Sequence, residues 1–232
     1  MLQPAPGSPE ELNAFAVLQR QLPALYERVA HDPRSKHLVV VVPSLSMDSR
    51  ELQKISGAHH YEERLLFFLM LLRRPRTRVL FLTSQAIHST VIDYYLHLLS
   101  GVPTSHARKR LFLMDCADAS ATPLSGKILT RPRMQKRVKE MIGQYDSAHM
   151  VCFNSSKLER TLAVQLNIPL YANDPSLLEL GTKSGCRETF REAGVLFPDG
   201  FERLQSANEI VEGLATLKGR DPDMRRAVVK LN

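Results

Sequence analysis

Features typical of several protein classes are missing from this chain of 232 residues. It has no tryptophan, and its three cysteines, Cys116, Cys152 and Cys186, are widely spaced with no C-x-x-C pair. An odd number of isolated thiols argues against a disulfide framework and against a structural zinc site. We therefore expect reduced thiols in a cytoplasmic protein.

Long apolar segments are also missing. The longest apolar run, residues 65–72, would measure about 12 Å as a helix, whereas a bilayer core is about 30 Å thick. The N-terminus lacks the basic segment and apolar stretch of a secretory signal. We expect no membrane partner.

Two common site signatures do not occur. The chain has no G-x-G-x-x-G dinucleotide fingerprint and no G-x-S-x-G nucleophile motif. His59, His60, Glu62 and Glu63 are close in sequence, but no third metal ligand follows at a defined spacing. We predict no metal site and interpret 60–64 as a helix start, where acidic residues favour the dipole.

Positive charge is present in excess, with a net charge of +7 and an isoelectric point near 9.5. Arginine and lysine gather at 73–78, 108–110 and 131–139. Such segments could attract nucleic acid, an anionic membrane or a polyphosphate. Because they lack interleaved aromatic residues for stacking, we do not expect nucleic acid as a partner and interpret most of these charges as solvated.

The N-terminal segment, 1–36, is predicted to be helical. Ser8 precedes Pro9 and Glu11, an arrangement typical of a helix start. Pro23 should kink or divide the element. Its expected apolar face contains Leu12, Phe15, Ala16 and Leu22, and we expect it to pack on the domain that follows.

Residues 37–173 alternate between predicted strands and helices. His37–Val42 is typical of a strand buried on both faces of a parallel sheet. Further strands are expected at 79–83, 111–114, 150–153 and 169–172. The intervening helices are expected at 62–73, 89–99, 127–142 with an interruption near Pro132, and 157–166. This order predicts an α/β fold, a Rossmann-like domain with an open parallel sheet.

Helix 62–73 is apolar nearly all round, which predicts deep burial. Ligands of open parallel sheets bind outside the carboxyl ends of the strands. Ser84, Gln85, His88 and Asn154 lie in such loops and are candidates for binding a carboxylate or an amine. Polar loop residues also form turns and caps, which remains the alternative for each.

A second domain, 174–232, is expected after the break at 173–175. Its first helix carries Lys183 in the first turn and an apolar face of Cys186, Phe190 and Ala193, and it ends at Gly194. A cation in a first turn opposes the helix dipole unless an anion joins it, and helix N-termini bind phosphate. The alternative is a solvated surface lysine.

A capped helix from Ser206 and a strand at 227–232 should complete this segment. Lys230 is the charged residue of that strand. A buried charge is costly without a partner, so Lys230 either meets an anion or points outward from an edge strand.

This succession of elements resembles the start of the ATP-grasp fold. Five segments are similar to carboxylate–amine ligases related to the pheganomycin-type peptide ligase, whose ATP-grasp region also occurs in IQ-motif-containing H proteins. They are HYEERLLF (60–67), DYYLHLLSGVPTSHARKRL (93–111), KILTRP (127–132), GTKSG (181–185) and VVKLN (228–232). The match extends from about residue 38 to 232.

The resemblance implies a pre-ATP-grasp domain followed by the start of an ATP-grasp lobe. ATP would phosphorylate a substrate carboxylate, and an amine would attack the acyl phosphate. Lys183 and Lys230 would reach the nucleotide phosphates, with Arg187 a weaker third candidate. The Gly-rich loop and the Mg²⁺ ligands would follow residue 232, so we expect these residues alone to be inactive.

A hypothesis of a different class is a non-catalytic substrate-binding or assembly module. An open strand edge near Val228 would allow pairing with a second copy. The residues assign no catalytic group and identify neither the carboxylate nor the amine.

Overall fold

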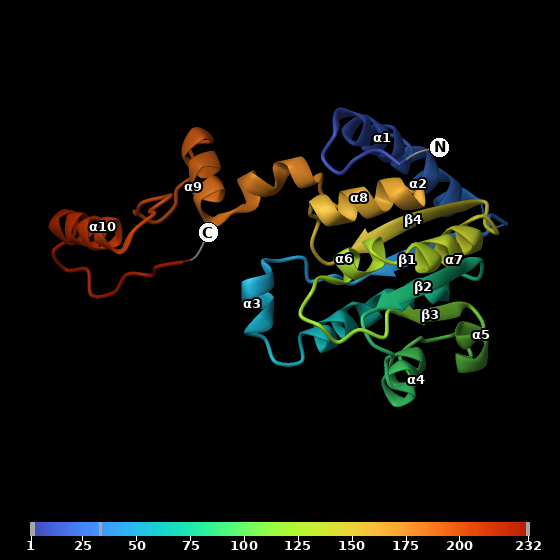
Figure 1. Ribbon diagram of the computed structural model, residues 1–232. Helices are drawn as coiled ribbons and strands as arrows, with labels where there is room; N and C mark the ends of the chain where they lie inside the picture. Colours follow the sequence, from blue (N-terminus) through green and yellow to red (C-terminus); the bar gives the residue numbers. More distant parts are fainter. Residues whose placement is uncertain (1–2, 33, 231–232) are drawn as a thin grey trace. The chain divides into compact units, whose positions relative to one another are not determined.

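The computed structural model describes residues 3–32 and 34–230. The chain divides into two compact units, one up to residue 173 and one from residue 174. Figure 1 labels their elements, and each unit is described by itself. Within the described residues, no helix has both the length and the apolar character needed to cross a membrane.

A parallel sheet forms the centre of the first unit. Its strands are β1 (His37–Val42), β2 (Thr77–Thr83), β3 (Leu111–Asp115) and β4 (Ser147–Cys152), in the order β3-β2-β1-β4. All six residues of β1 are buried, as expected for branched apolar residues inside a parallel sheet. The predicted α/β class and parallel sheet are confirmed.

The predicted fifth strand is wrong. Residues 169–172 make only an isolated parallel bridge, between Met150 and Leu170. The Gln19 side chain accepts from the Leu170 N–H and donates to its carbonyl oxygen, each at 2.8 Å. These Leu170 groups point away from β4, because the bridge to β4 uses the Pro169 carbonyl oxygen and the Tyr171 N–H. The Gln19 amide therefore covers the outer edge of this segment, and Pro169, which has no N–H, cannot extend the ladder toward the start of β4.

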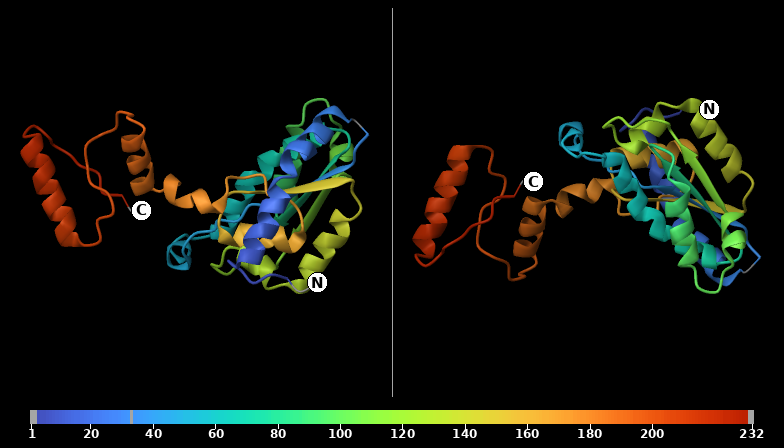
Figure 2. Two further views of the ribbon diagram at one scale, coloured as in Figure 1. Left: turned by 90° about the horizontal axis from the view of Figure 1, so that it is seen from above. Right: turned by 90° about the horizontal axis from the view of Figure 1, so that it is seen from below.

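Helices cover both faces of the sheet (Figures 1 and 2). One core contains the even-numbered β1 residues together with side chains of α1 (Pro9–Gln19), α6 (Leu124–Leu129), α7 (Pro132–Ile142) and α8 (Lys157–Leu166). The other contains the odd-numbered β1 residues, η1 (Ala58–Arg73), α4 (Ser89–His97) and α5 (Thr104–Arg108). This alternation follows from the two-residue period of a strand. The first unit also contains the helices α2 (Leu22–His31) and α3 (Ser49–Gln53).

The chain reverses its direction across the sheet at β1. It passes from β1 to β2 and β3, then returns to add β4 on the other side of β1. Loops at the carboxyl ends of such strands hold ligands in open α/β sheets. The loops after β1, β2, β3 and β4 are therefore the places to seek a site.

Element η1 differs from the helix predicted at 62–73. It is a 3₁₀ helix of 16 residues, and its three-residue turn places Leu66, Leu69 and Leu72 in one buried row. Phe67 and Met70 are exposed, at 51% and 57%. The predicted deep burial therefore holds for one side only, because a helix on one face of a sheet buries only the side that faces the sheet.

The start of α1 is confirmed, with the Ser8 hydroxyl accepting from the Glu11 N–H. Its buried face differs from the prediction, because Leu12 and Ala16 are exposed while Glu11 is buried. Glu11 forms an ion pair with Arg160 of α8 at 3.2 Å. This contact turns α1 so that Glu11, Phe15 and Leu18 face the first unit.

The second unit contains η2 (Pro175–Gly181), α9 (Lys183–Glu192) and α10 (Ala207–Arg220). Ion pairs connect its segments. Glu202 accepts from Arg187 and Arg191, and Arg203 contacts Glu179 and Glu188. The predicted apolar face of α9 is not buried, since Phe190 and Ala193 are exposed.

The strand predicted at 227–232 is wrong for 227–230, which have no regular structure and are exposed. Residues 231–232 lie outside the described residues. A strand needs a hydrogen-bonded neighbour, and no strand in 3–32 or 34–230 pairs with this segment.

Candidate functional site

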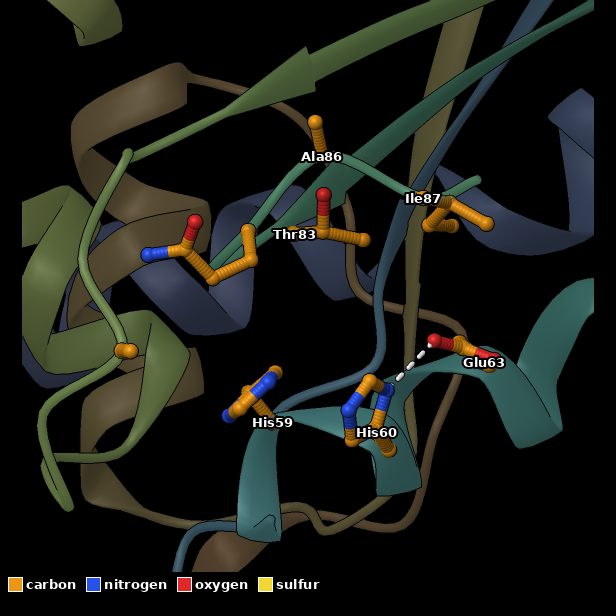
Figure 3. Close-up of a pocket in the computed structure, with 8 residues that line it drawn as sticks. His59, His60, Glu63, Thr83, Ala86 and Ile87 are labelled. Atoms are coloured by element: carbon orange, nitrogen blue, oxygen red, sulfur yellow. Dashed lines mark hydrogen bonds and ion pairs between the residues drawn. The ribbon is translucent and has the colours of Figure 1, made fainter. Parts of the chain in front are cut away.

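A cavity of about 360 Å³ lies at the carboxyl end of β2, within the first unit. Three elements line it: the first turns of η1, the loop after β2, and the loop after β3 (Figure 3). The lining residues are His59, His60, Glu63, Thr83, Gln85, Ala86, Ile87 and Ala119. We call this space the β2 cavity.

The start of η1 brings two imidazoles to the cavity. Gly57 precedes it with a φ of +63°, a left-handed conformation that favours glycine. The rings of His59 and His60 are 4.2 Å apart, and His60 Nδ1 lies 2.8 Å from Glu63 Oε1. Residues 60 and 63 meet because a three-residue turn aligns them.

A buried hydrogen-bonded cluster adjoins the cavity. The backbone N–H and the hydroxyl of Ser84 each donate to the Glu62 carboxylate at 2.5 Å. Lys127 Nζ donates to Ser84 Oγ and to the carbonyl oxygen of Asp118, both at 2.8 Å. The exposed fractions of Glu62, Ser84 and Lys127 are 5%, 0% and 3%. Since buried charges require partners, Ser84 lets both charged groups lie below the surface.

Burial shifts the ionisation of this cluster. It raises the pKa of Glu62 and lowers the pKa of Lys127, since both charged forms lose hydration. The pKa of the Asp118 carboxyl group, unlike that of Glu62, is lowered. Hydrogen bonds from Ser120, with a smaller contribution from Arg131 at 2.8 Å, lower the pKa of Asp118 to about 2.

His59 provides a neutral imidazole. Burial, followed by the neighbouring His60 ring and the charge of Lys127, lowers the pKa of His59 below 6.5. At neutral pH its ring therefore offers one donor and one acceptor. Gln85 places its amide oxygen 3.0 Å from the Asp118 N–H and 2.9 Å from the Ala119 N–H, in the orientation that satisfies both donors.

The four polar loop residues proposed from the sequence occupy different environments. Gln85 lines the β2 cavity, whereas Ser84 is buried in the adjoining cluster. His88 caps α4 by accepting from the Thr90 N–H at 3.3 Å, the role its alternative described. Asn154 follows β4, and its buried Oδ1 has no hydrogen-bond partner among the described residues. The structure thus brings Ser84 and Gln85 together at the end of β2.

The three phosphate-binding candidates lie in the second unit. Lys183 is the first residue of α9, and it is exposed, as is Lys230. Neither forms a hydrogen bond or an ion pair within the part of the chain that the structure describes. Arg187 donates to Glu202 and to the carbonyl oxygen of Pro198. Their roles in nucleotide binding stay predictions.

Sequence reasoning did not assign roles to Glu62, Lys127, Asp118 and Arg131. One signal pointed toward three of them. Glu62 belongs to the segment HYEERLLF, and Lys127 and Arg131 belong to KILTRP. The structure joins these distant segments through Ser84. No group of three possible metal ligands occurs among residues 3–32 and 34–230.

Two curated proteins resemble this chain. It is 28% identical over 206 residues to L-propargylglycine--L-glutamate ligase of Streptantibioticus cattleyicolor, a match covering 87% of this chain and 42% of that protein. It is 25% identical over 218 residues to IQ motif-containing protein H of Danio rerio, covering 87% and 20%. The chain spans less than half the length of either relative. No family model matches, and no solved structure matches.

Proposed function

We propose that this chain contributes to an ATP-dependent ligase that joins a carboxylate to an amine. The observation that carries the proposal is the similarity to a ligase of two amino acids, which extends over 87% of the chain. The meeting of the HYEERLLF and KILTRP segments in one buried cluster beside a cavity supports it, because function resides in sites rather than in folds.

In the proposed reaction ATP transfers its terminal phosphoryl group to the substrate carboxylate. The amine then attacks the acyl carbon, and an amide forms as phosphate leaves. Lys183 and Lys230 are assigned to the nucleotide phosphates, with Arg187 as a weaker third group. Such cations stabilise charge as it develops during transfer.

The described residues fit one part of this assignment. The amines of Lys183 and Lys230 have no partner within them, which leaves both available to phosphate. Magnesium normally accompanies ATP in such enzymes, but the described residues hold no group of three possible metal ligands. We assign no magnesium site to them and derive no step through the metal.

The test uses the protein expressed from its complete gene. ATP binding is measured by calorimetry with Mg²⁺ present, and ADP release is followed with L-glutamate paired with other amino acids. Lys183→Ala and Lys230→Ala should each weaken ATP binding about tenfold or more, as expected for a charge-assisted contact. Lys109→Ala is the control. It removes an exposed lysine of the first unit and should leave ATP binding unchanged.

Absence of ATP binding, or equal affinity in the three variants, would overturn the assignment. Binding of ATP without ADP release in the presence of the amino acids would instead favour the non-catalytic binding module.

A further inference from the structure

The β2 cavity has the size of a site for one small molecule. Its volume of about 360 Å³ is near the lower limit of ligand pockets, which range from about 300 to 1,000 Å³. Its lining combines ionisable, amide and apolar side chains. A compact ligand with separate polar and apolar parts would match this lining.

One side of the cavity carries a carboxylate. Glu63 accepts from His60 Nδ1 at 2.8 Å, and its side chain remains 31% exposed. An ionised carboxylate has about four lone-pair positions, so Glu63 retains acceptors after binding His60. A ligand ammonium is the complementary group, because a charged donor forms a stronger hydrogen bond than a neutral one.

The cavity also contains hydrogen-bond donors suited to an anion. The His59 ring has no hydrogen bond among the described residues and offers one N–H in its neutral form. The Gln85 amide, whose oxygen faces two backbone N–H groups, retains its own N–H groups. The positive charge of Lys127 also acts on His59, since it contributes to lowering the pKa of that ring.

Apolar side chains complete the lining. Figure 3 shows Ala86 and Ile87 on the strand-loop side, across the cavity from His59 and His60 on η1. They offer a surface for a short apolar side chain. The cavity thus combines a carboxylate that can accept from an ammonium, N–H groups that can donate to a carboxylate, and an apolar surface.

We propose that the β2 cavity binds one small α-amino acid as a zwitterion. Its ammonium would lie at Glu63, its carboxylate would face His59 and the Gln85 amide, and its side chain would contact Ala86 and Ile87. The proposal rests on the proposed function in that the bound amino acid would be a substrate of the ligase.

The test measures binding to the complete protein by calorimetry without ATP. The probes are L-alanine, L-valine and L-glutamate. The N-acetyl form of an amino acid lacks the ammonium, and its amide form lacks the α-carboxylate. At least one free amino acid should bind, and its N-acetyl and amide forms should bind at least about tenfold more weakly than the free form, since each loses a charge-assisted contact.

Variants place the binding in this cavity. Glu63→Gln keeps the shape of the side chain and should weaken binding of the free amino acid at least about tenfold. Glu140→Gln is the matched control, because Glu140 is an exposed α7 carboxylate outside the lining and should have no effect.

The proposal is overturned if none of the three free amino acids binds, if a blocked form binds as tightly as the free amino acid from which it is made, or if Glu63→Gln binds that amino acid as the unmodified protein does. ADP release separates this result from the ligase proposal. If Glu63→Gln releases ADP with an unchanged KM for the amino acid, the ligase proposal is supported and the proposed binding site is rejected. If amino-acid binding requires Glu63 but no ADP is released, the binding site is supported and the ligase proposal is rejected.

Discussion

Glu62 and Ser84 are joined by two hydrogen bonds, one from the backbone N–H of Ser84 and one from its hydroxyl, each 2.5 Å long. The pair connects the first turns of η1 to the end of β2. Because Lys127 donates to the same hydroxyl, a segment from the far side of the sheet is held at the same point.

Ser84→Ala should lower the free energy of unfolding. The change removes the acceptor of Lys127 and one of the two donors to Glu62, in a fully buried place. Loss of a buried hydrogen-bonding partner costs about 1–3 kcal/mol. Urea unfolding followed by circular dichroism measures it.

Ser100→Ala is the matched control, because Ser100 lies in an exposed turn. An equal effect in the two variants would show that the cluster contributes nothing specific to stability.

Glu11→Ala should lower the free energy of unfolding more than Ser84→Ala does. It leaves Arg160 buried without its ion-pair partner, which lies at 3.2 Å in the unmodified protein. Breaking a buried pair on one side costs about 3–5 kcal/mol. The double change Glu11→Leu with Arg160→Met should lose less than the single change, since it leaves no charge behind. Urea midpoints of the two proteins give the comparison.

Glu10→Ala controls for helix content, because Glu10 is exposed beside Glu11 in the same first turn. If Glu10→Ala and Glu11→Ala destabilise equally, the buried pair does not anchor α1.

Stability should fall as the pH falls from about 6.5 toward 4. His37 Nε2 lies 2.8 Å from His149 Nδ1. Burial, with the charge of Arg74, lowers the pKa of His37 to about 4, and burial with the His37 ring lowers the pKa of His149 to about 3. Below pH 6.5 the unfolded chain binds protons that the folded chain does not, so the free energy of unfolding decreases until these pKa values are passed.

Urea unfolding at pH 7.5, 6, 5 and 4.5 provides the measurement. His149→Gln should reduce the number of protons taken up on unfolding, which sets the slope of the unfolding free energy against pH, by about one. His106→Gln changes an exposed residue and should leave this slope unchanged. An unchanged slope in His149→Gln would contradict the prediction.

Gly185→Ala should loosen the start of α9. An added Cβ would collide with the carbonyl oxygen of Glu179 and approach the Thr182 hydroxyl, and such overpacking costs about 1–3 kcal/mol. Amide hydrogen exchange over 175–192 should become faster. Gly181→Ala is the matched control in the same segment, because a Cβ there meets no atom within 4 Å. Equal exchange in both variants would refute the steric argument.

The parallel sheet could be predicted because its information is local. The branched run of β1 and the helix signals between the strands indicate the architecture without knowledge of distant contacts. The strands predicted at 169–172 and 227–232 failed for a non-local reason. Apolar residues favour an extended chain, but a ladder forms only where a neighbouring strand lies in register. Residues 169–172 reach β4 at one bridge, and no described strand pairs with 227–230.

The candidate site could be predicted only in part. The rule that ligands lie at the carboxyl ends of strands led to Ser84 and Gln85. It could not reveal that Ser84 bridges Glu62 and Lys127, which are separated from it by 22 and 43 positions. Pairing of this kind depends on how the helices dock on the sheet, and no periodicity in the sequence records it.

The three-residue turn of η1 also determines which sequence changes this segment tolerates. Deleting one residue within it would rotate everything after the deletion by about 120°. A deletion between Glu62 and Leu66 would turn the row of Leu66, Leu69 and Leu72 away from the sheet, or else pull Glu62 away from Ser84. Substitutions act at one position of η1, whereas a change in its length separates its polar start from its apolar remainder.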